Sequence, residues 1–218
     1  MKRLIICLFI LICLNNCTKI GKNMTVKGRV MNPITGEGIP DIPIELQKTS
    51  KGLPGGFKTV KTIYTNENGN FEISKGGIDT YYLLVENLGN YYRIGWSTQG
   101  EEQGILGNKI KVKKRKVMYA DYYAVPYGKL QIVIKNNNCF DVNDELSIFR
   151  THSIQDFYSG VPNPAIYTGC VNQVGNLNKA PMGWYTYSGT VTKNGITTSI
   201  SDSIYLEEDE TEIWNINY

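Results

Sequence analysis

Short runs in which apolar and polar side chains alternate recur from residue 24 to residue 218, and this feature constrains the fold most. In the first run, Val26 and Val30 share one face, while Lys27 and Arg29 share the other. A period of two is that of a strand with one buried face, because successive side chains of a strand point to opposite sides. Further runs occur at residues 42–47, 81–85, 130–134, 146–149 and 212–218.

Composition also favours strands over helices. The chain has 15 Tyr, 6 Phe and 3 Trp among 218 residues, and its 22 glycines lie largely between the alternating runs. Aromatic residues fit pleated, half-buried surfaces, and glycines suit turns. Asn68-Gly69 predicts a hairpin with a type I′ turn, in which both central residues need positive φ. A rival reading, a cation site at residues 66–70, lacks the spacing of an EF-hand loop.

The number of strands and the length of the chain together predict an all-β protein with two tandem β-sandwich domains. We place the first domain at residues 24–124 and the second at 125–218. The segment 119–128 contains Pro126 and Gly128, and we interpret it as the boundary.

The first residues have the pattern of an export signal. Lys2 and Arg3 precede an apolar run at residues 4–14. As a helix this run would span about 16 Å, which is too short for a hydrocarbon layer of roughly 30 Å but suits a secretory signal. The four residues that end in Cys17, Leu-Asn-Asn-Cys, resemble a bacterial lipobox.

The lipobox resemblance implies a signal peptide at residues 1–16, a lipid on Cys17 and a tether at residues 17–23. It further implies a Gram-negative cell envelope, with the lipid as membrane partner and the outer membrane as location. Thr18 stands where an Asp would signal inner-membrane retention. Which side of the outer membrane the protein faces stays open. The alternative is an ordinary signal peptide with an incidental cysteine.

Charge excludes nucleic acid as a bulk partner. The formal charge is +3, and Lys2 and Arg3 account for two of these charges, so +1 remains after removal of the signal. A nucleic-acid-binding chain is usually much more basic.

Two of the five cysteines are predicted to form a disulfide. Cys7 and Cys13 lie in the signal and Cys17 carries the lipid, which leaves Cys139 and Cys170 in an exported chain. A metal site is the rival reading, but the chain has one His and no C-x-x-C motif. We therefore predict no metal and no cofactor.

Four motifs in the first domain resemble the carboxypeptidase regulatory-like family. They are G-R-V at residues 28–30, T-G-x-G-I-P-x-x-x-I-x-L at 35–46, T-x-x-x-G-x-F at 65–71 and T-Y-x-L-x-V at 80–85. The resemblance implies a transthyretin-like β-sandwich of seven strands. Such modules accompany peptidases, precede outer-membrane receptors and occur in exported lipoproteins. For the second domain we expect an immunoglobulin-like or transthyretin-like sandwich.

Three groups of residues are candidates for a ligand surface. The first is the basic strand with Lys111, Lys113 and Arg115, which suits anionic headgroups or acidic glycans, or else is a charged strand edge. The second and third are tyrosines, which offer stacking faces for sugars or pack internal contacts. They are Tyr119, Tyr122 and Tyr123 near the boundary, and Tyr158 and Tyr167 in a long loop held by the predicted disulfide.

The sequence favours a binding or structural role over catalysis. His152 is the only histidine, and there is no nucleophile elbow, phosphate loop or dinucleotide motif. We expect a non-catalytic envelope protein whose partner is a protein, a glycan or a surface polymer; the oligomeric state stays open. The alternatives are an accessory subunit of an outer-membrane transporter or secretion assembly, and a hydrolase that uses carboxylates.

Overall fold

The computed structural model describes residues 23–50, 55–77, 79–99, 107–114, 116–154, 157–158 and 164–218. These residues form fifteen strands and no helix, which confirms the predicted all-β class. The described residues therefore contain no helical segment that could span a lipid bilayer. The predicted signal, the tether with Cys17, and Arg115 lie outside the described residues.

The chain divides into two compact units. Unit 1 comprises the residues up to Met31 together with Glu37–Asn87 and Gly95–Tyr122. Unit 2 comprises Asn32–Gly36, Leu88–Ile94 and Tyr123–Tyr218. Two short segments from the first hundred residues thus belong to unit 2. The predicted division into residues 24–124 and 125–218 does not include this exchange of segments.

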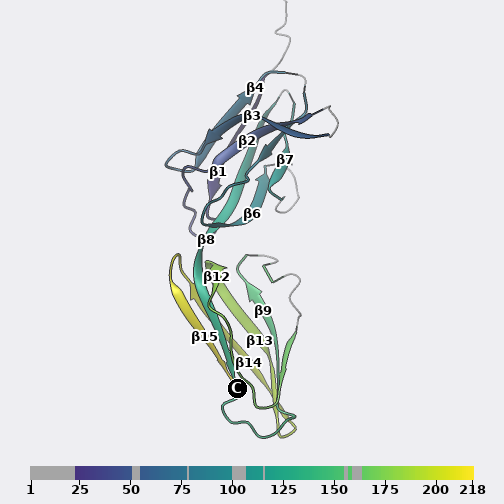
Figure 1. Cartoon of the computed structure of the whole chain (residues 1–218), viewed down its shortest axis with the longest axis vertical. Coiled ribbons are helices and arrows are strands. Elements are labelled where there is room, and N and C mark those ends of the chain that lie inside the picture. Colours follow the sequence, from purple (N-terminus) through teal and green to yellow (C-terminus); the bar gives the residue numbers. More distant parts are fainter. Residues whose placement is uncertain are drawn as a thin grey trace, which may run out of the picture. The chain divides into compact units, whose positions relative to one another are not determined.

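Unit 1 contains two sheets that together make a β-sandwich (Figure 1). In the first, β1 pairs with β4 and β8, and β6 also pairs with β8. The second has the order β3-β2-β5-β7. The bounds are β1 Met24–Met31, β2 Pro43–Ser50, β3 Gly56–Tyr64, β4 Asn70–Lys75, β5 Tyr81–Leu84, β6 Tyr91–Thr98, β7 Lys109–Lys111 and β8 Val117–Lys135.

The core of unit 1 consists of the apolar faces predicted from the alternation. Val26 and Val30 of β1 are fully buried, as are Ile44 and Leu46 of β2. Trp96 lies at the centre, edge-on to neighbouring rings, with centroids 5.9 Å from Phe71 and 5.0 Å from Tyr122.

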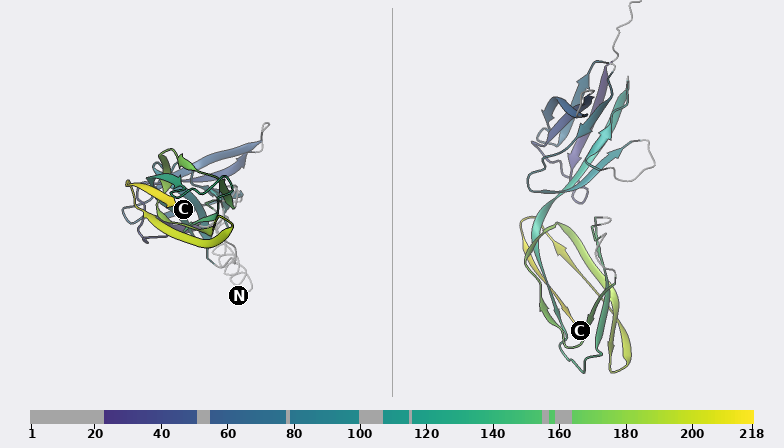
Figure 2. Two further views of the ribbon diagram at one scale, coloured as in Figure 1. Left: turned by 90° about the horizontal axis from the view of Figure 1, so that it is seen from below. Right: turned by 45° about the vertical axis from the view of Figure 1, so that its right-hand side comes forward.

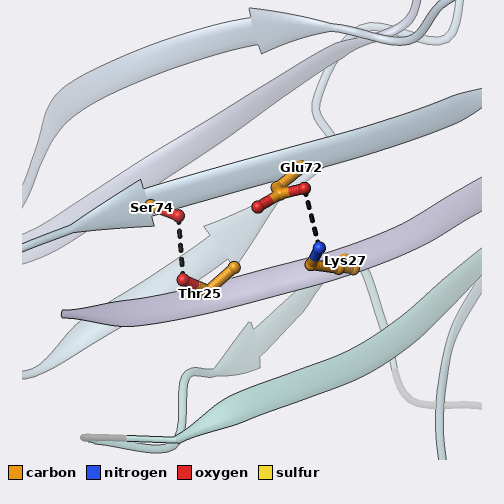
Figure 3. Close-up of polar contacts among 4 residues, drawn as sticks. All are labelled: Thr25, Lys27, Glu72 and Ser74. Carbon is orange, nitrogen blue, oxygen red and sulfur yellow. Dashed lines mark hydrogen bonds and ion pairs between the residues drawn. The ribbon is translucent and has the colours of Figure 1, made fainter.

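The outer face of β1 and β4 is polar. In their antiparallel register, Thr25 lies opposite Ser74 and Lys27 opposite Glu72. Figure 3 shows the two contacts, a hydrogen bond of 2.8 Å between the hydroxyls and an ion pair of 3.0 Å. Both charged side chains are about half exposed, so water screens the ion pair and it contributes little to stability.

The turn at Asn68-Gly69 differs from the prediction. Only Gly69 has positive φ, and β3 and β4, which it connects, pair with strands of different sheets. The predicted type I′ hairpin is therefore wrong. The side-chain oxygen of Asn66 instead accepts hydrogen bonds from the backbone N–H groups of Asn68 (3.1 Å) and Asn70 (2.9 Å), which is turn chemistry.

Unit 2 is also built from two sheets (Figures 1 and 2). In one, β11 and β12 pair with β8 antiparallel, and β15 pairs with it in parallel. The other has the order β10-β9-β13-β14. The bounds are β9 Glu145–His152, β10 Ala165–Thr168, β11 Asn172–Val174, β12 Asn178–Pro181, β13 Gly183–Lys193, β14 Ile196–Leu206 and β15 Thr211–Asn217.

The core of unit 2 lies between these sheets. Leu146 and Ile148 of β9 are fully buried against Tyr185 and Leu206, and Ile216 of β15 joins them. The hairpin that the sequence analysis missed lies here, at Asn194-Gly195 between β13 and β14. Both residues have positive φ, as a type I′ turn requires.

The segment 119–128, interpreted as a boundary, is not a loop. It lies within the nineteen-residue strand β8, and the division between the units falls inside that strand at Tyr122 and Tyr123. Pro126 is accommodated because β12 pairs from Tyr127 onward and does not need its missing N–H.

Candidate functional site

Unit 2 contains a cavity of about 310 Å³ that is lined by both of its sheets. Leu130, Ile132 and Ile134 of β8 form an aliphatic side of it. The volume is near the lower end of the roughly 300–1,000 Å³ that small-molecule sites occupy. It suits a single ring-sized group.

Aromatic rings line the rest of the cavity. They are Phe157 and Tyr158 from the loop after β9, Tyr167 of β10 and Tyr185 of β13. The predicted candidates Tyr158 and Tyr167 therefore converge on the same cavity.

The aromatic lining is held by its own contacts. The ring of Phe157 lies edge-on to Tyr158 at 5.1 Å and to Tyr185 at 6.0 Å. The Tyr185 hydroxyl donates a 2.7 Å hydrogen bond to the carbonyl of Pro181. Rings fixed in this way present apolar faces with little loss of side-chain entropy on binding.

The charged side chains among the described lining residues are both positive. Arg150 and Lys179 are the ionisable side chains of the lining other than tyrosines, and no described carboxylate is among the lining residues. The Arg150 guanidinium lies over the Tyr158 ring at 5.6 Å, and the Lys179 ammonium over the Tyr127 ring at 4.7 Å. Each cation–π contact positions a charge without neutralising it.

The side chains of Gln173, Asn176 and Asn178 add amide groups to the edge formed by β11 and β12. This edge is fixed at Gly175, whose N–H donates to the Ile132 carbonyl at 2.9 Å.

Burial raises the pKa of Tyr158 to about 12, so its hydroxyl stays protonated and can donate a hydrogen bond at neutral pH.

His152 lies behind the aromatic lining and outside the cavity. Its ring centroid is 4.3 Å from that of Tyr185 and 5.0 Å from that of Phe157. Its Nδ1 accepts a 2.9 Å hydrogen bond from the Ile154 N–H. Burial lowers the pKa of His152 to about 4, so the ring is neutral at pH 7 and serves as a packed, hydrogen-bonded group that is partly buried.

The predicted disulfide joins Cys139, after β8, to Cys170, after β10.

A buried carboxylate lies nearby: the Asp144 carboxylate accepts hydrogen bonds of 2.8 Å from the Asn136 side chain and from the Phe140 N–H. These hydrogen bonds, above all that of Asn136, hold the pKa of Asp144 below its ordinary value. The Lys193 ammonium donates a 2.6 Å hydrogen bond to the other side of the same Asn136 amide.

The predicted basic strand forms a separate hollow in unit 1. Lys111 and Lys113 line about 690 Å³ of space together with Lys109 and Lys114. The Lys109 ammonium lies 3.2 Å from the centre of the Phe57 ring. This hollow has positive charge but presents no aromatic ring among its described lining residues.

The three tyrosines near the boundary do not form one surface. Because they lie on a strand, Tyr119 and Tyr123 share one face and Tyr122 points to the other. Tyr119 is half exposed beside Lys27 and Asp121, whereas Tyr122 is fully buried against Trp96. Tyr122 therefore offers no surface to a ligand, and its selection as a candidate was wrong.

Sequence reasoning missed Arg150, Phe157 and Tyr185 as site residues. The alternation marks Tyr185 as a core residue, and Arg150 stands on a strand like many surface arginines. The pairing of β9 with β13 brings Arg150 and Tyr185 onto one sheet, and Phe157 reaches the cavity from the loop after β9. No group of three or more metal-ligating side chains occurs in the part of the chain that the structure describes.

Comparison with known proteins assigns no family. Neither a protein-family model nor a curated protein sequence matches the chain. Among solved structures, the streptococcal ancillary pilin is similar over 89% of this chain at 13% identity, with a TM-score of 0.35. The minor pilin of Streptococcus agalactiae is similar over 89% of this chain and 94% of its own length, at 11% identity and a TM-score of 0.34.

A DUF3823 family protein from Bacteroides uniformis is similar over 84% of this chain and 98% of its own, at 10% identity and a TM-score of 0.33. This chain spans 62% of the length of the streptococcal ancillary pilin. TM-scores this low identify neither a shared fold family nor a shared role. The site is therefore interpreted from its own residues.

Proposed function

We propose that this chain is a non-catalytic, lipid-anchored protein of a Gram-negative outer membrane, and that unit 2 binds a glycan of a surface polymer. The cavity of unit 2 carries the proposal. It combines fixed aromatic faces, which stack on the apolar faces of sugar rings, with side-chain amides, which match sugar hydroxyls. A flat apolar surface suited to a protein partner lacks this combination.

The chemistry of the described lining supports the proposal of binding without catalysis. Enzymes that hydrolyse a glycosidic bond typically use a pair of carboxylates, one on each side of the bond. The described lining residues include neither a carboxylate nor a histidine. The buried Asp144 is engaged by Asn136 and Phe140, and it does not line the cavity.

Unit 1 is proposed to be a carboxypeptidase regulatory-like module. Two of its motif glycines stand at positions that would not accept a side chain without strain. A side chain at Gly28 would overlap the Ala120 carbonyl of the neighbouring strand β8, and Gly69 has a φ of 75°. The unit would serve as a spacer between the lipid and unit 2.

Removing the Tyr167 ring tests the glycan site. Tyr167→Ala should weaken binding of a surface polysaccharide by about tenfold, because an aromatic stacking face is lost. The measurement is binding of the purified protein to an array of bacterial polysaccharides, followed by titration of the strongest match. Tyr64→Ala is the matched control, since Tyr64 is 65% exposed on β3, outside the cavity. Equal losses in both variants would contradict the proposal.

Replacing Cys17 tests the anchor. Cys17→Ser should move the protein from the membrane fraction to the soluble fraction, because a chain without acyl groups has no stable hold on the bilayer. Fractionation of cells and mass spectrometry of the N-terminal peptide provide the measurement. Thr18→Ser is the control and should stay with the membrane. An unacylated Cys17 in the wild type would contradict the proposal.

A further inference from the structure

We propose that the cavity of unit 2 selects a sugar ring that carries a carboxylate, and that Arg150 pairs with this carboxylate. The inference rests on the proposed glycan-binding function and assigns its ligand class, an acidic sugar of a surface polymer.

The first observation is the charge of the cavity. Arg150 and Lys179 both line it, and no described acidic residue does so. A neutral sugar would gain nothing from two positive charges, whereas an anionic one would. Arg150 is half-buried beside aromatic rings, where opposite charges attract more strongly than in bulk water, whereas Lys179 is exposed at the edge of the cavity.

The second observation is the state of Arg150. The guanidinium is half-buried, and no described carboxylate forms an ion pair with it. Its one described partner is the face of Tyr158, at 5.6 Å. A guanidinium that lies over a ring face makes no hydrogen bond to it, so the N–H donors in its own plane stay available, and this fork matches the two oxygens of a carboxylate.

The third observation is that Tyr158 is itself held in place. Its ring lies edge-on to Phe157 at 5.1 Å and to Tyr185 at 6.3 Å, and Tyr185 is fully buried. The position of the guanidinium is therefore set before a ligand arrives, which lowers the entropy cost of binding.

The fourth observation concerns the rest of the ligand. The lining also includes Gln173, Asn176 and Asn178, whose side-chain amides can both donate and accept hydrogen bonds, although Asn178 already donates one to the Asn176 carbonyl at 3.2 Å. A pyranose ring offers hydroxyls of the same dual character. The volume of about 310 Å³ suits one such ring, with the chain of the polymer leaving through the open side.

The test compares matched ligands by calorimetry with the purified protein. The probes are the methyl glycosides of glucuronic and galacturonic acid and those of glucose and galactose, which differ in one carboxylate. At least one acidic glycoside should bind about 10- to 100-fold more tightly than its neutral counterpart. Its affinity should fall as salt concentration rises.

The variants assign the preference to one side chain. Arg150→Gln should abolish the preference for the acidic glycoside, and Arg150→Lys should retain part of it, because charge remains but the fork is lost. Lys129→Gln removes the same charge from an exposed position outside the cavity and should leave the preference intact. Thermal unfolding of each variant checks that unit 2 still folds.

Three results would overturn the inference. Equal binding of acidic and neutral glycosides would refute the selection for a carboxylate and leave the proposed function standing. The protein could instead bind benzoate and neither the acidic nor the neutral glycosides, and lose this binding in Arg150→Gln. That result would show a site for an aromatic acid. Absence of binding by all glycosides and by the polysaccharide array would refute both the inference and the proposed function.

Discussion

Replacing Cys139 and Cys170 together by serine should lower the free energy of unfolding of unit 2 by roughly 3–4 kcal/mol, the effect that chain entropy gives for a loop of this length. The two cysteines are 31 residues apart, and the loop between them includes β9, β10 and the lining residues Phe157 and Tyr158. Without the bond, this loop is freer in the unfolded chain. Urea unfolding measures the change in the free energy of unfolding, with hydrogen exchange of the amides in β9 and β13 as the probe of unit 2.

Unit 1 is the internal control for the disulfide. Exchange of β1 and β4 should be unchanged, because the two strands belong to unit 1 and both cysteines to unit 2. A reducing agent should bring the wild type to the level of the double variant and leave the variant as it was. Equal stability of unit 2 with and without the bond would contradict the prediction.

Acidification should destabilise unit 2 through His152. The pKa of this residue is about 4 in the folded protein, against an ordinary value of 6.5. Because the pKa of His152 is lower in the folded protein, the unfolded chain binds the proton more readily. The stability that neutral His152 gives the folded state is therefore present above pH 6.5 and is lost as the pH falls towards 4. Because part of the ring faces solvent, we expect a loss of about 1–2 kcal/mol rather than the roughly 3 kcal/mol of a fully buried ring.

His152→Asn separates this effect from other titrations. The Asn side-chain oxygen can accept the hydrogen bond that Ile154 donates to Nδ1, but Asn does not titrate. Urea unfolding of both proteins at pH 7 and pH 4.5 gives the comparison. The wild type should lose more stability than His152→Asn over this interval. Parallel losses would show that His152 does not couple unit 2 to pH.

The strands were predictable because their alternation reflects burial directly. Ile44 and Leu46, or Leu146 and Ile148, occupy one face of a strand wherever a sandwich buries that face. Turn chemistry was less reliable. Asn68-Gly69 and Asn194-Gly195 are the same dipeptide type, yet only the second joins paired strands. Which strands pair is a long-range property that the local dipeptide does not contain.

The candidate site was predictable only in part. Tyr158 and Tyr167 stood out because they lie in a long segment held by the predicted disulfide, and binding residues often lie in such loops. Arg150 did not, because its meaning depends on the Tyr158 ring beside it and on the absence of a described acid partner. Tyr122 was misjudged because a cluster of tyrosines in sequence separates onto two faces once it lies in a strand.

The parallel pairing of β15 with β8 has a consequence for biosynthesis. Residues 129–135 of β8 align with residues 211–217 of β15, and Trp214 and Ile216 complete the core against them. During translation, this edge of β8 therefore stays unpaired until residue 217 has left the ribosome and β15 can pair with it. Unit 1 uses residues of β8 only as far as Tyr122, so it can complete its sheets earlier. The chain would thus fold in order from unit 1 to unit 2, and chaperones that protect open strand edges would be needed mainly for unit 2.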